Sequence, residues 1–413
     1  MPDLRSLTTS TPGLVVTEHE LDVPLDHARP DGPTITVFAR EVAEPDGRDR
    51  PFLVYLQGGP GFEAVRPTRY PSSSGWMDRA LRDFRVLMLD QRGTGRSTPV
   101  GVVPGTVEEQ VAYLTCFRAD SIVADAELLR QALGVERWSV LGQSFGGFCT
   151  LRYLSAAPQG LAGAYLTGGL PPIGLHPDEV YAATFARTLE RTRRYYERYP
   201  QDRDRVLRLH ERVRGGQIVL PDGEPLSWNR FRQHGNTLGT SDGAERLHHL
   251  LELPPDSPAF LHDVARPMAF ERNPVYAVLH EACYADGGVT GWSAERVRPP
   301  EYDDDPTLFT AEHVFPWMLD DYRGLRHLRE AAHALAAHEW PRLYDPDVLA
   351  ANDVPCAAAV YVEDLYVESE LSVRTAAQVR GMRTWVTNEY EHNGLRADGG
   401  RVLGRLLDLA AGR

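Results

Sequence analysis

A glycine-flanked serine between an apolar strand and a helix constrains the fold of this chain more than any other feature. The stretch 138–141 is typical of a buried strand, and helical spacing follows up to about residue 157. Between them lies Gly142-Gln143-Ser144-Phe145-Gly146, which matches the pattern G-x-S-x-G. Small residues two positions to either side of Ser144 let neighbouring backbones pass closely, so that the hydroxyl projects from a sharp turn. The pattern predicts a nucleophilic serine at one edge of a sheet.

Strands and helices alternate on both sides of this motif. Short apolar segments separated by Gly and Pro predict strands, and the helical spacing of 120–133 ends at Gly134. The alternation predicts an α/β fold with a mostly parallel sheet that is covered by helices on both faces. The expected strands are 35–37, 52–56, 86–89, 138–141, 162–167, 357–362 and 382–386, and the expected later helices are 369–380 and a closing helix to residue 411.

The middle of the chain has a different character. It is rich in Arg, His, Tyr and acidic residues at helical spacing, as in EVYAATFARTLERTRRYYERY, and contains few strand candidates. We therefore expect a helical cap domain over residues 171–349, inserted into a core domain made of residues 1–170 and 350–413. A chain of 413 residues is long enough for such an elaborated single core.

The charged residues argue against several functions. The formal net charge is −14, so the average field repels nucleic-acid phosphates and anionic membrane surfaces, and we expect neither as a partner. All 44 residues in the Lys+Arg count are arginine, because the sequence contains no lysine. This excludes a Schiff-base lysine, a serine–lysine dyad and the lysine of a phosphate-binding P-loop.

The cysteines and the N-terminal residues indicate in which cellular compartment the protein is expected. The four cysteines are widely separated and form no C-x-x-C pair, so we expect neither a zinc site nor a disulfide framework. The first 14 residues lack the apolar core of an export signal, and no stretch approaches about 18 consecutive apolar residues. We therefore expect a soluble, cytoplasmic protein, whose oligomeric state does not follow from the sequence.

Candidates for a base and for an orienting carboxylate lie near the C-terminus. A serine hydroxyl is a weak nucleophile unless a base accepts its proton and a carboxylate orients that base. His392 follows the last predicted strand and is our candidate base. Glu363 and Asp364 come just after the strand 357–362, at the edge where ligands gather in open α/β sheets. Neighbouring side chains point to opposite sides of an extended segment, so only one can face the histidine, and we favour Asp364.

A glycine-rich turn, Gln57-Gly58-Gly59-Pro60-Gly61, comes directly after the strand 52–56. Such a turn can aim a backbone N–H at the oxyanion that forms during acyl transfer. Gly59 is our candidate for the first donor, and the N–H of Phe145, next to the serine, is the second. Alone, the turn would be interpreted as an ordinary turn, but here it precedes the predicted nucleophile in the expected chain order.

These segments resemble the proline iminopeptidase (prolyl aminopeptidase) family of α/β-hydrolases. The resemblance lies in QGGPG at 57–61, DQRGTGRS at 90–97, GQSFGG at 142–147 and EHNGL at 391–395. It implies the α/β-hydrolase fold and release of an N-terminal residue, preferentially proline, from short peptides with a free N-terminus. The reaction would pass through an acyl-enzyme and need no metal or organic cofactor. Ser144, Asp364 and His392 map onto the family's triad, and Gly59 with Phe145 maps onto its oxyanion hole.

The resemblance also implies a glutamate in the cap that anchors the free α-amine of the substrate. Glu281 looks like the matching position and Glu312 is a second candidate, although an exposed helix charge is the alternative interpretation of Glu281. The sequence departs from the family pattern at Gln57, where histidine is usual, and at Phe145, where tryptophan is frequent. Asp90 and Arg92 are interpreted as structural, holding the loop beside the serine by ion pairing.

Two alternatives to an aminopeptidase remain open at this level. An esterase or amidase could use the same triad, because fold and nucleophile do not determine the substrate. A hydrolase-like binding protein that does not turn its ligand over belongs to a different class. Such proteins commonly lack a triad member, whereas this sequence has a candidate for each of the three positions.

Overall fold

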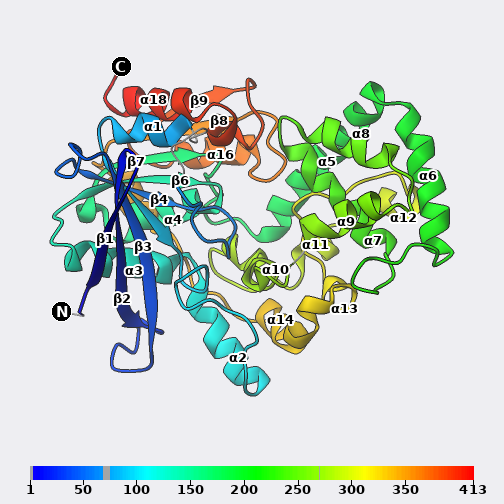
Figure 1. Ribbon diagram of the computed structural model, residues 1–413, viewed down its shortest axis with the longest axis horizontal. Coiled ribbons are helices and arrows are strands. Elements are labelled where there is room, and N and C mark those ends of the chain that lie inside the picture. Colours follow the sequence, from blue (N-terminus) through cyan, green and yellow to red (C-terminus); the bar gives the residue numbers. More distant parts are fainter. Residues whose placement is uncertain (1–2, 68–74, 269) are drawn as a thin grey trace.

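A computed structural model describes residues 3–67, 75–268 and 270–413 of the chain (Figure 1). In these ranges a sheet of nine strands has the order β1-β2-β3-β5-β4-β6-β7-β8-β9. The pairs that link β1, β2, β3 and β5 are antiparallel, and all pairs from β5 across to β9 are parallel. The predicted mostly parallel sheet is confirmed, with an antiparallel N-terminal extension. The strands are β1 (Arg5–Thr11), β2 (Leu14–Pro24), β3 (Thr34–Ala43), β4 (Phe52–Leu56), β5 (Arg85–Asp90), β6 (Trp138–Gln143), β7 (Leu161–Thr167), β8 (Cys356–Tyr361) and β9 (Met382–Thr387).

Helices cover both faces of the parallel part of the sheet. Along β4, Val54 and Leu56 belong to the apolar cluster that includes α3 and α4, whereas Leu53 and Tyr55 belong to the cluster of α1 and α18. This split follows from the alternation of side chains along a strand. β4 is buried at every position, as expected for a strand with both faces covered. These helices are α1 (Gly75–Leu81), α3 (Ala119–Ala132), α4 (Phe145–Ala156) and α18 (Gly399–Ala410), and α16 (Ser369–Ala376) packs beside β8.

A long helical segment connects β7 to β8 and lies to one side of the sheet in Figure 1, where it is coloured green to yellow. Its first helix, α5, buries residues at helical spacing along one face. This segment contains the stretch 171–349, for which the sequence predicts a cap. We propose that 171–349 forms a cap domain and that the rest of the chain forms the core domain. The helices of the segment are α5 (Pro177–Arg198), α6 (Gln201–Arg214), α7 (Trp228–Arg232), α8 (Gly243–Glu252), α9 (Pro258–Ala265), α10 (Pro274–Leu279), α11 (Ser293–Arg296), α12 (Glu301–Asp304), α13 (Met318–Asp321), α14 (Arg329–Ala336) and α15 (Pro346–Ala350).

Several elements differ from the sequence-based expectation. All residues of β1 are exposed, so this strand has no buried face that would produce an alternating pattern. Helices α1 and α2 (Val107–Leu114) were not expected, although Thr106 and Glu109 form a capping box at the start of α2. The predicted closing helix is interrupted at Asp398, whose φ of −148° is not helical, and this residue separates α17 (Gly394–Ala397) from α18. None of the helices in the described ranges has both the length and the apolar character of a membrane span.

Candidate active site

Ser144 occupies a strained turn between β6 and α4. Its φ of 55° and ψ of −126° are rare for a residue with a side chain. The turn is so tight that a Cβ added at Gly142 would lie 2.3 Å from the carbonyl oxygen of Gly146, and one at Gly146 would lie 1.9 Å from that of Leu56. Glycine is therefore required on both sides of the serine. The geometry is that of the predicted strand–turn–helix motif.

The glycine-rich turn after β4 packs directly against this serine. A Cβ at Gly58 would lie 2.9 Å from the Cβ of Ser144, so no larger residue fits between the two turns. Gly59 has a φ of 139°, a conformation that favours glycine, and it lines the same cavity as Ser144. Phe145 is the first residue of α4 and is buried. The two predicted N–H donors therefore belong to adjacent turns beside the serine.

His392 and Asp364 form a buried pair at the ends of β9 and β8. Nδ1 of His392 lies 2.7 Å from Oδ2 of Asp364, and the backbone N–H groups of Tyr366 and Val367 donate to Oδ1 of the same carboxylate at 2.8 and 3.0 Å. The competing carboxylate, Glu363, does not join this pair. These hydrogen bonds hold Asp364 in one orientation and leave Nε2 of the imidazole facing the cavity.

The surroundings of the His392 imidazole tune its basicity. The side-chain nitrogen of Gln143, the residue before the serine, lies 3.3 Å from Nε2, and the ring of Tyr366 packs edge-on at 4.7 Å. Burial lowers the pKa of His392, but the charge and hydrogen bond of Asp364 and the charge of Glu312 outweigh it. The pKa of this histidine is therefore raised above its ordinary value.

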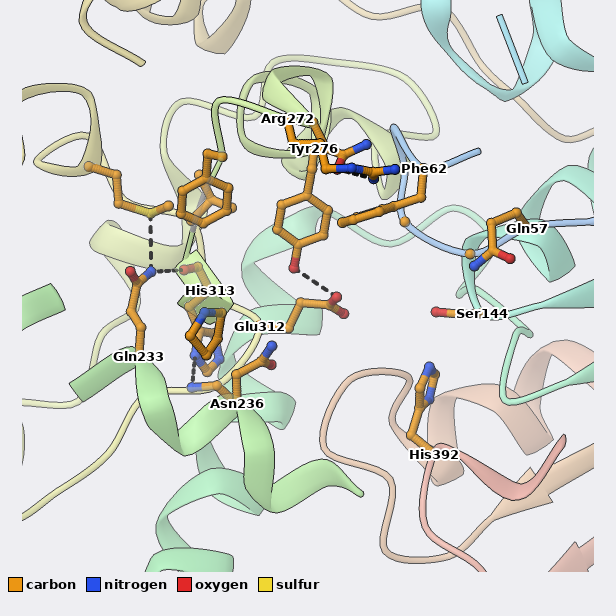
Figure 2. A pocket seen from close by; sticks show the side chains of 18 of the residues that line it. Gln57, Phe62, Ser144, Gln233, Asn236, Arg272, Tyr276, Glu312, His313 and His392 are labelled. Atoms are coloured by element: carbon orange, nitrogen blue, oxygen red, sulfur yellow. Dashed lines mark hydrogen bonds between the residues drawn. The ribbon is translucent and has the colours of Figure 1, made fainter. Parts of the chain in front are cut away.

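A cavity of about 520 Å³ brings most of the candidate residues together (Figure 2). Ser144 and Glu312 point toward one another across it, and the imidazole of His392 points in from a third side. Aromatic rings form one wall, where Tyr276 packs against Phe62 at 5.5 Å and against Phe270 at 5.9 Å. Other lining residues are Gln57, Gly58, Gly59, Gln143, Gln233, Asn236, Arg266, Pro267, Arg272, Asn273, Ala311, His313, Val314 and Met318.

Glu312 is a carboxylate held in place on the cavity wall opposite the serine. The hydroxyl of Tyr276 donates to its Oε1 at 2.8 Å, and Nε2 of the buried His280 lies 3.6 Å from its Oε2. Burial raises the pKa of Glu312, yet His280, His392 and the Tyr276 hydrogen bond together hold that pKa below its ordinary value. The side chain is therefore a fixed negative charge, a suitable partner for a positively charged group in the cavity.

Glu281, the first candidate for binding an amine, does not line this cavity. Its side chain is buried, and its Oε1 accepts a hydrogen bond from the backbone N–H of Ala294 at 3.0 Å, at the start of α11. Burial is the largest influence on its carboxyl group and raises its pKa. The structure thus places Glu312, and not Glu281, with Ser144 and His392.

Comparison with known proteins identifies the family. A model of the alpha/beta hydrolase fold matches residues 51–317. A proline iminopeptidase of Aeromonas sobria is 46% identical over 421 aligned residues, which cover 96% of this chain and 97% of that protein. The chain belongs to the proline iminopeptidase family. Another member, a proline iminopeptidase of Aspergillus aculeatus, is 33% identical over 96% of this chain and 94% of its own length. The predicted α/β-hydrolase fold and family resemblance are confirmed.

Sequence reasoning missed several residues that shape the cavity of this proline iminopeptidase family member. Tyr276 and Phe62 form its aromatic wall, and Gln233 and Asn236 line its far end. Tyr276 lies in the short helix α10, Gln233 and Asn236 lie in a 3-10 helix, and Phe62 follows the glycine-rich turn, and no short motif marks any of them. Among the described residues, no cluster of three or more His, Cys, Asp or Glu side chains could hold a metal ion.

Proposed function

We propose that this protein is a serine aminopeptidase that releases N-terminal proline from short peptides through an acyl-enzyme. One observation carries the proposal: in a member of the proline iminopeptidase family, a serine and a histidine share a cavity with a fixed carboxylate on the opposite wall. Nucleophile and base at one end, and a negative charge at the other, match a substrate with a scissile carbonyl and an ammonium group.

In this proposal Ser144 is the nucleophile, His392 the general base and Asp364 the group that orients the base. His392 accepts the serine proton at Nε2 while Oγ attacks the carbonyl carbon of the first residue. The Asp364 carboxylate keeps the proton of the imidazole on Nδ1, as their 2.7 Å separation supports. The N–H groups of Gly59 and Phe145 stabilise the oxyanion, and each such donor contributes about 3 kcal/mol to lowering the barrier.

The second half of the reaction reuses the same groups. His392 donates its proton to the amine of the departing peptide, which leaves proline joined to Oγ as an ester. A water molecule then enters, His392 removes a proton from it, and the resulting tetrahedral intermediate collapses to release proline and restore Ser144. Apart from this water, the cycle uses only side chains and backbone N–H groups of the chain itself.

Glu312 is the proposed anchor of the substrate's ammonium group. A carboxylate whose pKa is held low stays ionised, and a desolvated ammonium needs such a partner. An anchor opposite the nucleophile restricts cleavage to the first peptide bond, because a residue further along the chain has no free amine to place there. The neighbouring rings of Tyr276 and Phe62 offer an apolar surface for a pyrrolidine ring.

Turnover of proline 4-nitroanilide by Glu312→Gln tests this assignment. Loss of a buried ion pair with the substrate should lower kcat/KM by about 30- to 150-fold, because such a pair is worth about 2–3 kcal/mol. Glu281→Gln is the matched control, since it changes a buried carboxylate outside the cavity, and it should retain nearly full activity. Equal losses in the two variants would contradict the role of Glu312.

Two further substrates separate the proposal from its alternatives. An N-blocked proline anilide should be a poor substrate, since its uncharged nitrogen cannot pair with Glu312. If this compound and a 4-nitrophenyl acyl ester are turned over faster than the free-amine anilide, an esterase or amidase is favoured. If a fluorophosphonate probe fails to label Ser144 at all, a non-catalytic binding protein is favoured.

We further propose a cytoplasmic location. The four cysteines are buried and unpaired in the structure, as expected for a protein of a reducing compartment. Measurement of the protein's distribution between cytoplasmic and exported fractions tests this placement. Recovery mainly from the exported fraction would contradict it.

A further inference from the structure

Helix α5 carries a row of arginines that faces the two loops bearing Asp364 and His392. Arg187, Arg191 and Arg194 are spaced four and three residues apart, so they share one side of the helix. Arg187 pairs with Glu368 at 2.7 Å, and Arg194 pairs with Glu363 at 2.6 Å. The first α-helix of the segment is thereby tied to the residues that follow β8.

Arg191 differs from its neighbours because it reaches both loops. Its Nη1 lies 3.3 Å from Oε2 of Glu363, and its Nη2 pairs closely with Oε2 of Glu391. Glu363 immediately precedes Asp364, and Glu391 immediately precedes His392. One guanidinium therefore bridges the residues adjacent to both members of the buried Asp364–His392 pair. The planar fork of arginine suits such a bridge, because it can bind two carboxylates at once.

Arg191 offsets the repulsion among three nearby carboxylates. Glu363, Glu391 and Asp364 are three carboxylates on two neighbouring loops, and their mutual repulsion favours separation of the loops. Burial raises the pKa of Glu391, and Arg191 counteracts that by favouring the ionised form. Arg191 and Glu391 have side chains only 18% and 19% exposed, so solvent screens their attraction less than that of a surface pair.

We propose that Arg191 is a positioning residue that holds the Asp364 and His392 loops together, so that the imidazole is presented to Ser144. This inference rests on the proposed function, because it assumes that these three residues perform the chemistry. Arg191 itself does not line the cavity and contacts no reacting atom. It acts through the backbone of the two loops, by fixing the glutamate next to each catalytic side chain.

The test compares Arg191→Ala with Arg193→Ala in the full-length enzyme. Arg193 lies on the same helix, is exposed and has no ion pair among the described residues, so its removal should leave activity unchanged. A small displacement of an imidazole costs about 10- to 100-fold in rate, so Arg191→Ala should lower kcat by that factor with KM changed less than threefold. The rate of fluorophosphonate labelling of Ser144, which depends on the base and not on the amine anchor, should fall in parallel.

The pH profile supplies a measurement that loss of stability alone would not alter. Removal of the positive charge of Arg191 takes away a repulsion that opposes the imidazolium form of His392, so the acidic limb of kcat should move to higher pH. Arg191→Lys keeps a positive charge but offers a single ammonium, and it should retain the wild-type limb and recover part of the rate.

The outcomes separate this inference from the proposed function. If wild type labels at Ser144 but Arg191→Ala labels as fast as wild type, the positioning role is rejected and the proposed function stands. A rate loss that matches the unfolded fraction, with an unmoved acidic limb, also rejects it. If wild type neither labels nor turns over proline 4-nitroanilide, the proposed function itself fails.

Discussion

Nδ1 of His392 lies 2.7 Å from Oδ2 of Asp364, although 28 residues separate them along the chain. They meet because β8 and β9 are adjacent parallel strands, whose carboxyl ends lie at the same edge of the sheet. The other carboxylate of the first loop, Glu363, instead faces the arginines of α5. Although Glu363 and Asp364 are neighbours in the chain, their side chains point in different directions, and only Asp364 contacts His392.

Asp364→Asn should lower kcat by about 10⁴-fold with little change in KM. An amide can donate to Nδ1 and so favours the imidazole tautomer that cannot accept the serine proton. Glu363→Gln should cost less than tenfold, because this side chain does not contact the imidazole. Steady-state kinetics on proline 4-nitroanilide measures both variants, and a larger loss in Glu363→Gln would reverse the assignment.

Activity should increase with pH as His392 loses its proton, since only the neutral imidazole can act as a base. The pKa of His392 is raised, so the acidic limb of kcat/KM should lie above the ordinary histidine value of 6.5. Glu312 is one of the charges that raise it, and Glu312→Gln should therefore move the limb to lower pH. An ester substrate without an ammonium group isolates this effect from amine binding, and a limb that moves upward would contradict it.

The sequence singled out the proposed catalytic groups because each follows the end of a strand. The order of apolar segments places Ser144, Asp364 and His392 after β6, β8 and β9, and parallel strands then bring those ends to one edge. Strand β1 lacked such a signal, because exposure along its whole length removes the pattern that burial imposes. Strand-based reasoning therefore succeeds where at least part of a strand is buried, as in the edge strand β9, and fails for β1, which is exposed at every position.

The proposed amine anchor could not be chosen from sequence for a different reason. Glu281 begins a 3-10 helix of three residues and Glu312 lies in an irregular stretch, and each has a histidine as neighbour. Which carboxylate faces the cavity depends on how short helices pack against one another over long sequence distances. In the structure Glu281 binds the N–H of Ala294, and Glu312 turns to the cavity. No local pattern distinguishes these two outcomes.

Replacement of glycine by alanine should destabilise the protein in the tight turn at Ser144 but not at an ordinary helix position. Gly146→Ala would place its Cβ 1.9 Å from the carbonyl oxygen of Leu56, so the backbones must move apart. We expect a loss of about 3 kcal/mol or more in the free energy of unfolding, together with loss of activity. Gly404→Ala in α18 is the control, because its Cβ meets only Nε of Arg79 at 3.6 Å. Gly404→Ala should raise the free energy of unfolding, measured with urea, by about 0.5–1 kcal/mol. An unchanged free energy of unfolding in Gly146→Ala would contradict the packing argument.

Arg92 supports the loop beside the active site from within the core. Its side chain is 0% exposed, its Nε donates to Asp125 at 2.6 Å, and its Nη1 donates to the carbonyl oxygens of Leu25 and Cys116 at 2.6 and 2.8 Å. Arg92→Leu should lower the free energy of unfolding by about 3 kcal/mol, because the buried Asp125 carboxylate then loses its guanidinium partner and, among the described residues, keeps only its contact with His27 at 2.8 Å.

The double variant Arg92→Leu/Asp125→Leu should recover much of that loss, since no unpaired charge is then buried. Neither residue lines the cavity, so the folded fraction of either variant should retain kcat within about twofold of wild type. Urea unfolding measures the stability, and titration of Ser144 with a fluorophosphonate probe counts active molecules. If the double variant is no more stable than the single one, the loss comes from packing and not from the unpaired charge.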